Sequence, residues 1–179
     1  MNLPNILTLM RVLLIPLFVI LIIDKSFSWA LVTFAVAGIT DAIDGLIARV
    51  TRQRTELGAY LDPIADKLLL SSAFITLAII ELIPSWLTVI VLTRDVIILI
   101  GFLMFFLTNR RPRMAPSLMS KVTTFFQIST VILFLLSEYY PIPRMVYNVA
   151  IYGVIIFTII SGTHYVFLGA RVLNEKKNH

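Results

Sequence analysis

Four aspartates in one short stretch carry the most specific chemistry that this chain offers. They lie at the ends of two hydrophobic segments and are Asp41, Asp44, Asp62 and Asp66. An ionised carboxylate is costly in such a segment, so each of the four is a candidate functional residue. Four like charges at close range cannot all stay ionised without a cation among them. One or two divalent metal ions held by oxygen ligands would meet this requirement most simply.

Helical spacing places these aspartates and their small neighbours on two faces that can meet. One face of the first segment holds Asp41, Asp44, Gly45, Ala48 and Arg49. One face of the next segment holds Gly58, Asp62 and Asp66, which are spaced by four residues. Only the short polar link Thr51–Leu57 separates the segments. The spacing therefore predicts that two neighbouring helices bring the four carboxylates together.

The composition of the whole chain predicts a membrane protein. Of its 179 residues, 59% are hydrophobic and only 14% are charged, and the mean hydropathy is +0.94. Apolar runs of about 20 residues recur, which is the length that a membrane-spanning helix needs. We therefore expect an all-α integral membrane fold with six transmembrane helices, forming one domain over residues 1–179. The expected spans are Leu3–Ile23, Phe27–Val50, Tyr60–Leu82, Trp86–Leu107, Ser117–Leu136 and Met145–Leu168.

Charge and cysteine content narrow the function classes. The formal net charge is +5, and with no soluble basic face this favours anionic headgroups or phosphorylated substrates over nucleic acid. The absence of cysteine excludes a thiolate nucleophile and a disulfide framework. Lys and Arg concentrate in alternate loops, which predicts that both termini face the cytoplasm. Asp41 lies about 14 Å along the helix from Val50, so the site would face the cytoplasm.

The aspartate pattern closely resembles the signature of the CDP-alcohol phosphatidyltransferase family. It reads D-x-x-D-G-x-x-A-R, eight further residues, then G-x-x-x-D-x-x-x-D, with every position present between Asp41 and Asp66. The first helix also resembles that of bacterial members, in the pattern from Pro4 and Asn5 through Thr8 to Arg11. The resemblance implies six transmembrane helices, a homodimer, and Mg2+ or Mn2+ as the cofactor.

The resemblance also implies a role for each residue of the signature. Asp41, Asp44, Asp62 and Asp66 would hold metal at the pyrophosphate of CDP-diacylglycerol, and Asp66 would also act as the catalytic base on the acceptor hydroxyl. The CDP group would be bound by Asp44, Gly45, Ala48, Arg49, Gly58, Asn5 and Thr8. Phosphatidyl transfer would then release CMP, as a step of phospholipid biosynthesis.

The acceptor alcohol is left with two alternatives. An acceptor phosphate needs further cations, and the candidates are Arg94, Lys121 and Arg110. Phosphatidylglycerophosphate synthases, which use glycerol-3-phosphate, typically carry further cations where this chain has Phe102 and Thr123. The segments around Arg94 and Lys121 instead resemble cardiolipin synthases, which use phosphatidylglycerol. We favour glycerol-3-phosphate and keep phosphatidylglycerol as the alternative.

The charged residues also allow other interpretations. Each carboxylate can be a structural ion pair, for example Asp44 with Arg49, or Asp95 with its neighbour Arg94. A membrane ion or metal transporter would also use an acidic cluster, but no inverted repeat and no pair of broken helices accompany it. A non-catalytic scaffold with a structural metal would not require the glycines and the arginine of the nucleotide side.

Overall fold

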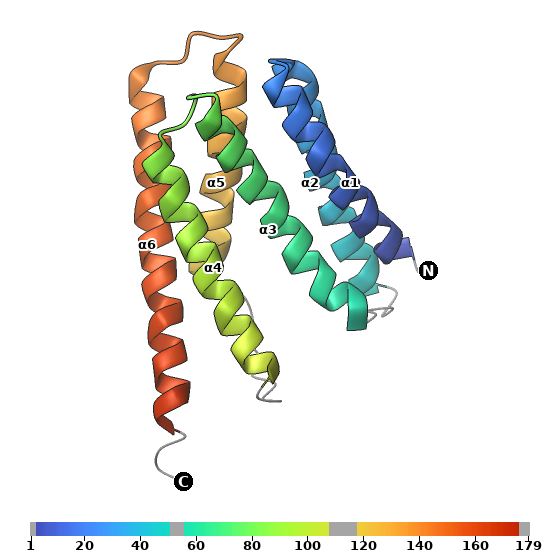
Figure 1. The fold of residues 1–179 in the computed structure, drawn as a ribbon, viewed down its shortest axis with the longest axis vertical. Coiled ribbons are helices and arrows are strands. Elements are labelled where there is room, and N and C mark those ends of the chain that lie inside the picture. The colour runs from blue at the N-terminus through green and yellow to red at the C-terminus, as the bar shows by residue number, and fades with distance from the viewer. Residues whose placement is uncertain (1–2, 51–55, 108–117, 176–179) are drawn as a thin grey trace. The chain divides into compact units, whose positions relative to one another are not determined.

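The structure, a computed structural model, is helical throughout the part of the chain that it describes. It describes the backbone of residues 3–50, 56–107 and 118–175, and the side chains of residues 9–41, 43, 64–101, 118–165 and 167. Six helices occupy this part (Figure 1). They are α1 (Leu3–Ile23), α2 (Phe27–Val50), α3 (Glu56–Ile79), α4 (Ser85–Leu107), α5 (Leu118–Ser137) and α6 (Arg144–Glu175).

The helix bounds agree with the apolar runs for α1 and α2 and differ elsewhere. Helix α3 begins at Glu56 and ends at Ile79, so Pro63 lies inside the helix and not in its first turn. Helix α6 continues to Glu175, beyond the end of the apolar run. Among the described residues, two helical stretches are long and apolar enough to cross a membrane, Leu118–Ser137 and Arg144–Tyr165.

The helices divide into two compact units. Unit 1 contains Met1–Ser85 and Val131–Pro141, and unit 2 contains Trp86–Thr130 and Ile142–His179. Unit 1 therefore holds α1, α2, α3 and the last third of α5, from Val131. Unit 2 holds α4 from Trp86, the part of α5 up to Thr130, and α6. The complete aspartate motif belongs to unit 1, whereas Arg94 and Lys121 belong to unit 2.

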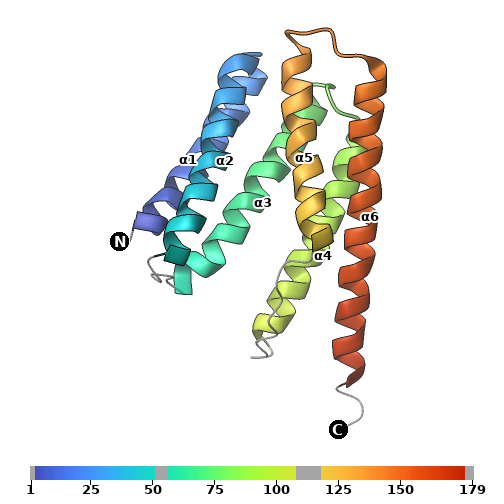
Figure 2. The same ribbon diagram turned by 180° about the vertical axis from the view of Figure 1, so that it is seen from behind.

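Within unit 1 the first three helices alternate in direction. Helix α1 packs against both α2 and α3, and the rings of Phe18 and Phe34 lie 5.4 Å apart between α1 and α2. Figures 1 and 2 both show the start of α1, the end of α2 and the start of α3 at the same end of this unit. The aspartate motif occupies that end, because it runs from the last turns of α2 into the first turns of α3.

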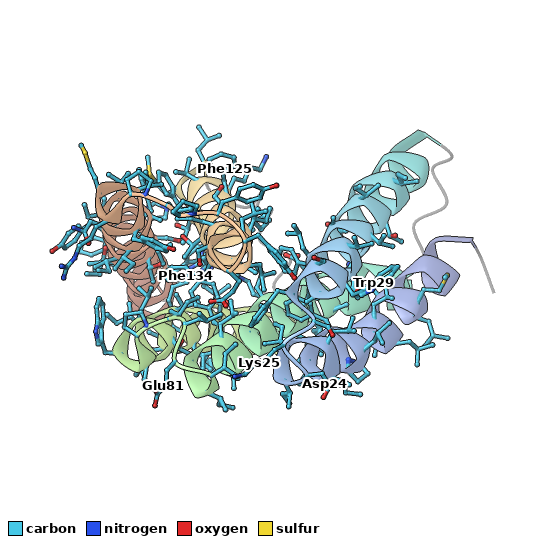
Figure 3. All side chains as sticks on the ribbon, turned by 90° about the horizontal axis from the view of Figure 1, so that it is seen from above. Asp24, Lys25, Trp29, Glu81, Phe125 and Phe134 are labelled. Atoms are coloured by element: carbon cyan, nitrogen blue, oxygen red, sulfur yellow. The ribbon has the colours of Figure 1, made fainter. Side chains whose placement is uncertain are left out.

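At the opposite end of unit 1, α1 and α3 each end in a tight turn (Figure 3). After α1, Lys25 takes a left-handed conformation with φ of 56°, and Glu81 does the same after α3 with φ of 62°. The amide of Ser26 donates to the carbonyl of Leu21, as in a Schellman motif. The corresponding bond after α3 joins Leu82 to Leu77. The turn after α1 reverses the chain so that α2 returns toward the motif end.

Unit 2 is held together by close helix contacts. The ring of Phe126 on α5 stacks on that of Phe157 on α6, with 4.8 Å between the centroids. Gly153 on α6 makes this possible, because a Cβ at that position would lie only 2.5 Å from the Phe126 ring. The small residue lets the α5 aromatic side chain lie directly on the α6 backbone.

Candidate functional site

The first aspartate of the motif is held by a buried arginine from another helix. Nη1 of Arg11 on α1 lies 2.6 Å from Oδ1 of Asp41 on α2. The Arg11 side chain is 0% exposed, whereas the Asp41 side chain is 42% exposed. Burial of a guanidinium is strongly unfavourable unless it is paired, so the aspartate compensates this charge. The carboxylate is thus anchored on its buried side and accessible on the other.

The rest of the motif is placed by the backbone of α2 and α3. Asp66 lies on α3 and is partly exposed. Asp44, Gly45, Ala48 and Arg49 belong to α2, and Gly58 and Asp62 to α3, but their side chains lie outside the described residues. The same holds for the side chains of Asn5 and Thr8 on α1. The motif therefore lies on consecutive helices of one unit, as its spacing predicts.

The donor chemistry of this end fits a hard divalent cation. Among the side chains that the structure describes, no three of His, Cys, Asp and Glu gather into a metal-binding group, and Asp44 and Asp62 are not among those side chains. The two carboxylates of the motif whose side chains are described, Asp41 and Asp66, offer oxygen ligands. Mg2+ and Mn2+ prefer such ligands. Asp41 is oriented by Arg11 and exposed enough for a cation to reach it.

Arg94, the candidate for the acceptor phosphate, is at the centre of a polar network in unit 2. Its guanidinium is 2% exposed and lies 2.7 Å from Oδ1 of Asp95, so the local ion pair is formed. Nη2 donates to the hydroxyl oxygens of Ser120 on α5 and Ser161 on α6, at 2.8 Å each. Arg94 thereby joins α4 to both neighbouring helices, and its charge is balanced locally.

The other acceptor candidates differ from Arg94 in exposure. Lys121, in the first turns of α5, is exposed and directly follows Ser120. Thr123, at a place where a second cation was expected, is fully buried, and its hydroxyl lies within hydrogen-bond distance of the carbonyl oxygens of Met119 and Phe157. Arg110 and the side chain of Phe102 lie outside the described residues.

Sequence reasoning missed the partner of Asp41. The motif predicts two facing helices, whereas the arginine that pairs with Asp41 comes from α1, thirty residues earlier in the chain. One signal was present in the sequence, since Arg11 is the only charged residue within the apolar run of residues 3–23. An arginine at such a position is expected to have an acidic partner inside the bundle.

Comparison with known proteins agrees with the motif. A sequence model of the CDP-alcohol phosphatidyltransferase family matches residues 1–160. The probable phosphatidylglycerophosphate synthase of Mycobacterium tuberculosis strain H37Rv is 37% identical over 97% of this chain and 83% of that relative. The CDP-diacylglycerol–glycerol-3-phosphate 3-phosphatidyltransferase of Bacillus subtilis is 31% identical over 92% of this chain and 93% of that relative. Human cardiolipin synthase (CMP-forming) is 38% identical over 71% of this chain and 48% of that relative.

Proposed function

The chain belongs to the CDP-alcohol phosphatidyltransferase family, and we propose that it transfers a phosphatidyl group from CDP-diacylglycerol to glycerol-3-phosphate. The observation that carries this proposal is the complete aspartate signature at one end of unit 1, with Asp41 anchored there by Arg11. Family membership makes the protein a CDP-diacylglycerol-dependent phosphatidyltransferase of phospholipid biosynthesis. The identity of the acceptor, the metal and the role of each residue are part of the proposal.

Four carboxylates would hold Mg2+ or Mn2+ in this proposal, namely Asp41, Asp44, Asp62 and Asp66. A bound divalent cation supplies charge neutralisation at the pyrophosphate and orients it for an in-line displacement. The residues of the chain provide oxygen ligands on two consecutive helices, and Arg11 adds a fixed positive charge behind Asp41. The oxygen-only donor set supports a hard cation over zinc or copper.

Asp66 would act as the general base. Its carboxylate would accept the proton of the acceptor hydroxyl while the hydroxyl oxygen bonds to the lipid-side phosphorus. The bond from this phosphorus to the bridging oxygen of the pyrophosphate breaks, and the electron pair leaves with CMP. Arg49 would balance charge on the departing phosphate. No covalent enzyme intermediate is required.

The nucleotide would be held against small residues. Gly45, Ala48 and Gly58 lack bulk, which suits close approach of a ligand to the helix backbone. Asp44 and Arg49 on α2 would contribute polar contacts to CDP. Asn5 and Thr8 would add polar groups from the first turns of α1. This assignment rests on the complete family pattern in the sequence.

Coverage of the relatives supports glycerol-3-phosphate as the acceptor. The similarity to the B. subtilis enzyme, whose name includes this acceptor, extends over more than nine-tenths of both chains. Lys121 is exposed and suits direct contact with the acceptor phosphate, with Arg110 as a second candidate. Arg94 is paired with Asp95 and donates hydrogen bonds to Ser120 and Ser161. It would therefore act indirectly, by fixing the turn of α5 that carries Lys121.

Phosphatidylglycerol is the alternative acceptor. The paired charge of Arg94 and the uncharged side chain of Thr123 favour it. The charge of Arg94 is balanced by Asp95, and Thr123 is a buried hydroxyl at a position where a cation was expected. A phosphodiester carries less charge than the phosphomonoester of glycerol-3-phosphate and needs fewer cations. The human cardiolipin synthase matches the chain over a shorter length at similar identity.

The membrane arrangement follows from the same proposal. All six helices would span a bacterial-type inner membrane, with both termini and the aspartate site facing the cytoplasm and the protein forming a homodimer. The distribution of Lys and Arg among the loops supports this orientation. Cysteine-accessibility labelling of single-cysteine variants at Lys25 and Lys177 tests it, because the native chain contains no cysteine. Opposite labelling sides are expected, and the same side for both would overturn the topology.

The function is tested by measuring CMP release from CDP-diacylglycerol with Mg2+ or Mn2+. Glycerol-3-phosphate and phosphatidylglycerol are offered separately to the purified protein. We expect CMP with glycerol-3-phosphate only, and no CMP from a folded Asp66→Asn variant. Turnover with phosphatidylglycerol only would assign the alternative acceptor. Metal flux across vesicles without CMP production from either acceptor would refute phosphatidyl transfer and favour a transporter.

A further inference from the structure

We infer that Arg11 is a positioning residue for the metal site, which acts by holding the carboxylate of Asp41 in place. The inference rests on the proposed function, because it takes Asp41 to be a metal ligand. It adds a residue of α1 that lies outside the aspartate signature. The ion pair between Nη1 of Arg11 and Oδ1 of Asp41, at 2.6 Å, is the observation from which the argument starts.

Burial places the guanidinium inside unit 1. Arg11 is 0% exposed and belongs to α1, which packs against both α2 and α3, the two helices of the motif. A guanidinium stays protonated inside proteins, so burial does not remove the charge of Arg11. A permanent charge with no access to solvent requires a fixed anionic partner. Asp41 supplies this partner.

The two side chains of the Arg11–Asp41 pair differ in exposure, which distinguishes this pair from one that only holds helices together. Arg11 is fully covered, but the Asp41 side chain is 42% exposed. The ion pair in unit 2 has both members covered, at 2% for Arg94 and 4% for Asp95. An ion pair that only joins helices has no need of an accessible carboxylate. Arg11 instead fixes Asp41 from its buried side and leaves the aspartate where a cation can reach it.

Such an arrangement acts on the metal through its ligand. The contact between Nη1 of Arg11 and Oδ1 of Asp41 is an ion pair. Outer partners of a metal-binding side chain fix its orientation, and their removal typically lowers metal affinity or activity by about 10- to 100-fold. The rigid, planar guanidinium restricts the carboxylate more than a lysine ammonium would. Arg11 also offsets one of the four negative charges that the motif gathers, which lowers the repulsion that the metal-free protein must tolerate.

Mn2+ binding to the purified, full-length protein tests this inference without turnover. Bound and free Mn2+ are measured by electron paramagnetic resonance, with no lipid substrate present. We expect Arg11→Gln to weaken Mn2+ binding by about 10- to 100-fold and Arg11→Lys to weaken it less. In an Asp41→Asn background, Arg11→Gln should cause no further loss, because Arg11 acts through Asp41.

Two controls separate positioning from a loss of folding. Each variant must elute as a monodisperse peak with wild-type helical circular dichroism, and Arg11→Lys retains the charge if Arg11→Gln does not fold. Arg94→Lys alters another buried, aspartate-paired arginine, which lies in unit 2, and should leave Mn2+ affinity unchanged. An equal loss in Arg94→Lys, wild-type affinity in folded Arg11→Gln, or additive losses in the double variant would each overturn the inference. Unchanged Mn2+ affinity in Asp41→Asn would instead refute the proposed metal site itself.

Discussion

Among the side chains that the structure describes, a buried arginine pairs with an aspartate in each unit, and the two ion pairs differ in how much of the carboxylate is covered. In unit 1 the Arg11–Asp41 pair joins α1 to α2 and leaves Asp41 42% exposed. In unit 2 the Arg94–Asp95 pair is closed, and Arg94 also binds hydroxyl groups of α5 and α6. The same two residue types therefore produce an accessible acid in one unit and an internal link between helices in the other.

The difference teaches how to interpret charged residues inside apolar helices. A buried ion pair gives little net stability compared with apolar residues of the same shape, so its presence alone does not reveal its purpose. Exposure of one partner and the number of helices joined are more informative. By these measures the Arg94–Asp95 pair belongs to the internal packing of unit 2, and the exposure of Asp41 supports its proposed place in the metal site.

Replacing the two aspartates by asparagine should separate these roles most strongly. Asp41→Asn should lower phosphatidyl transfer by about 1,000-fold or more, because a metal ligand supports several kcal/mol of transition-state charge stabilisation. Asp95→Asn should reduce the yield of folded protein, while CMP release per folded molecule changes by less than about tenfold. CMP release normalised to the monodisperse fraction measures both. Comparable losses per folded molecule would abolish the distinction between the pairs.

Removing the arginine of the closed pair should affect stability. Arg94→Met leaves Asp95 buried without this partner and removes the bonds to Ser120 and Ser161, so the free energy of unfolding should fall by about 3 kcal/mol. Denaturant unfolding in detergent, followed by circular dichroism, measures this loss. The double variant Arg94→Met, Asp95→Leu serves as the control, because removing both charges should restore most of the stability. A double variant as unstable as Arg94→Met would contradict the assignment of the loss to the buried Asp95 charge that no longer has Arg94 beside it.

The sequence predicted the local part of this arrangement and not the tertiary part. Apolar runs matched the bounds of α1 and α2, because Asp24 and Lys25 end one run and the basic link ends the other. The last expected span ends at Leu168, whereas α6 continues to Glu175. Hydropathy marks only the apolar part of a helix, and the helix itself continues as long as its backbone hydrogen bonds do. No Gly or Pro interrupts residues 171–175, so nothing in that segment stops the helix.

The site was predictable to the same extent. The spacing from Asp41 to Asp66 is a property of consecutive helix turns, and the family that it predicted is confirmed. The roles of the individual aspartates stay predictions. The bond from Arg94 to Ser161 joins residues 67 positions apart, and only the packing of α4, α5 and α6 brings them together. Long-range pairs of this kind have no signature in the spacing of either segment.

A smaller effect is expected from a buried amide that shares the interior of unit 2. Gln127 on α5 is 0% exposed, and within the described part of the chain neither its Nε2 nor its Oε1 has a hydrogen-bond partner. Gln127→Leu should therefore raise the free energy of unfolding by about 1 to 2 kcal/mol. Denaturant unfolding in detergent gives the value, with Thr123→Val as the opposite control, because its hydroxyl is bonded. A destabilised Gln127→Leu variant would show that the amide is satisfied in the folded protein.

The smallest effect should come from the turns at the end of unit 1 opposite the motif. Glu81 has a φ of 62° after α3, a conformation that costs a residue with a Cβ about 1 to 2 kcal/mol and that glycine adopts freely. Glu81→Gly should raise the free energy of unfolding by about 0.5 to 1 kcal/mol after the entropy loss of glycine is subtracted. Thermal unfolding in detergent detects this gain, with Glu81→Ala as the control that keeps the strain. Because the turn lies away from the aspartates, CMP release per folded molecule should not change, and a change would show that the turn end and the motif end of unit 1 are coupled.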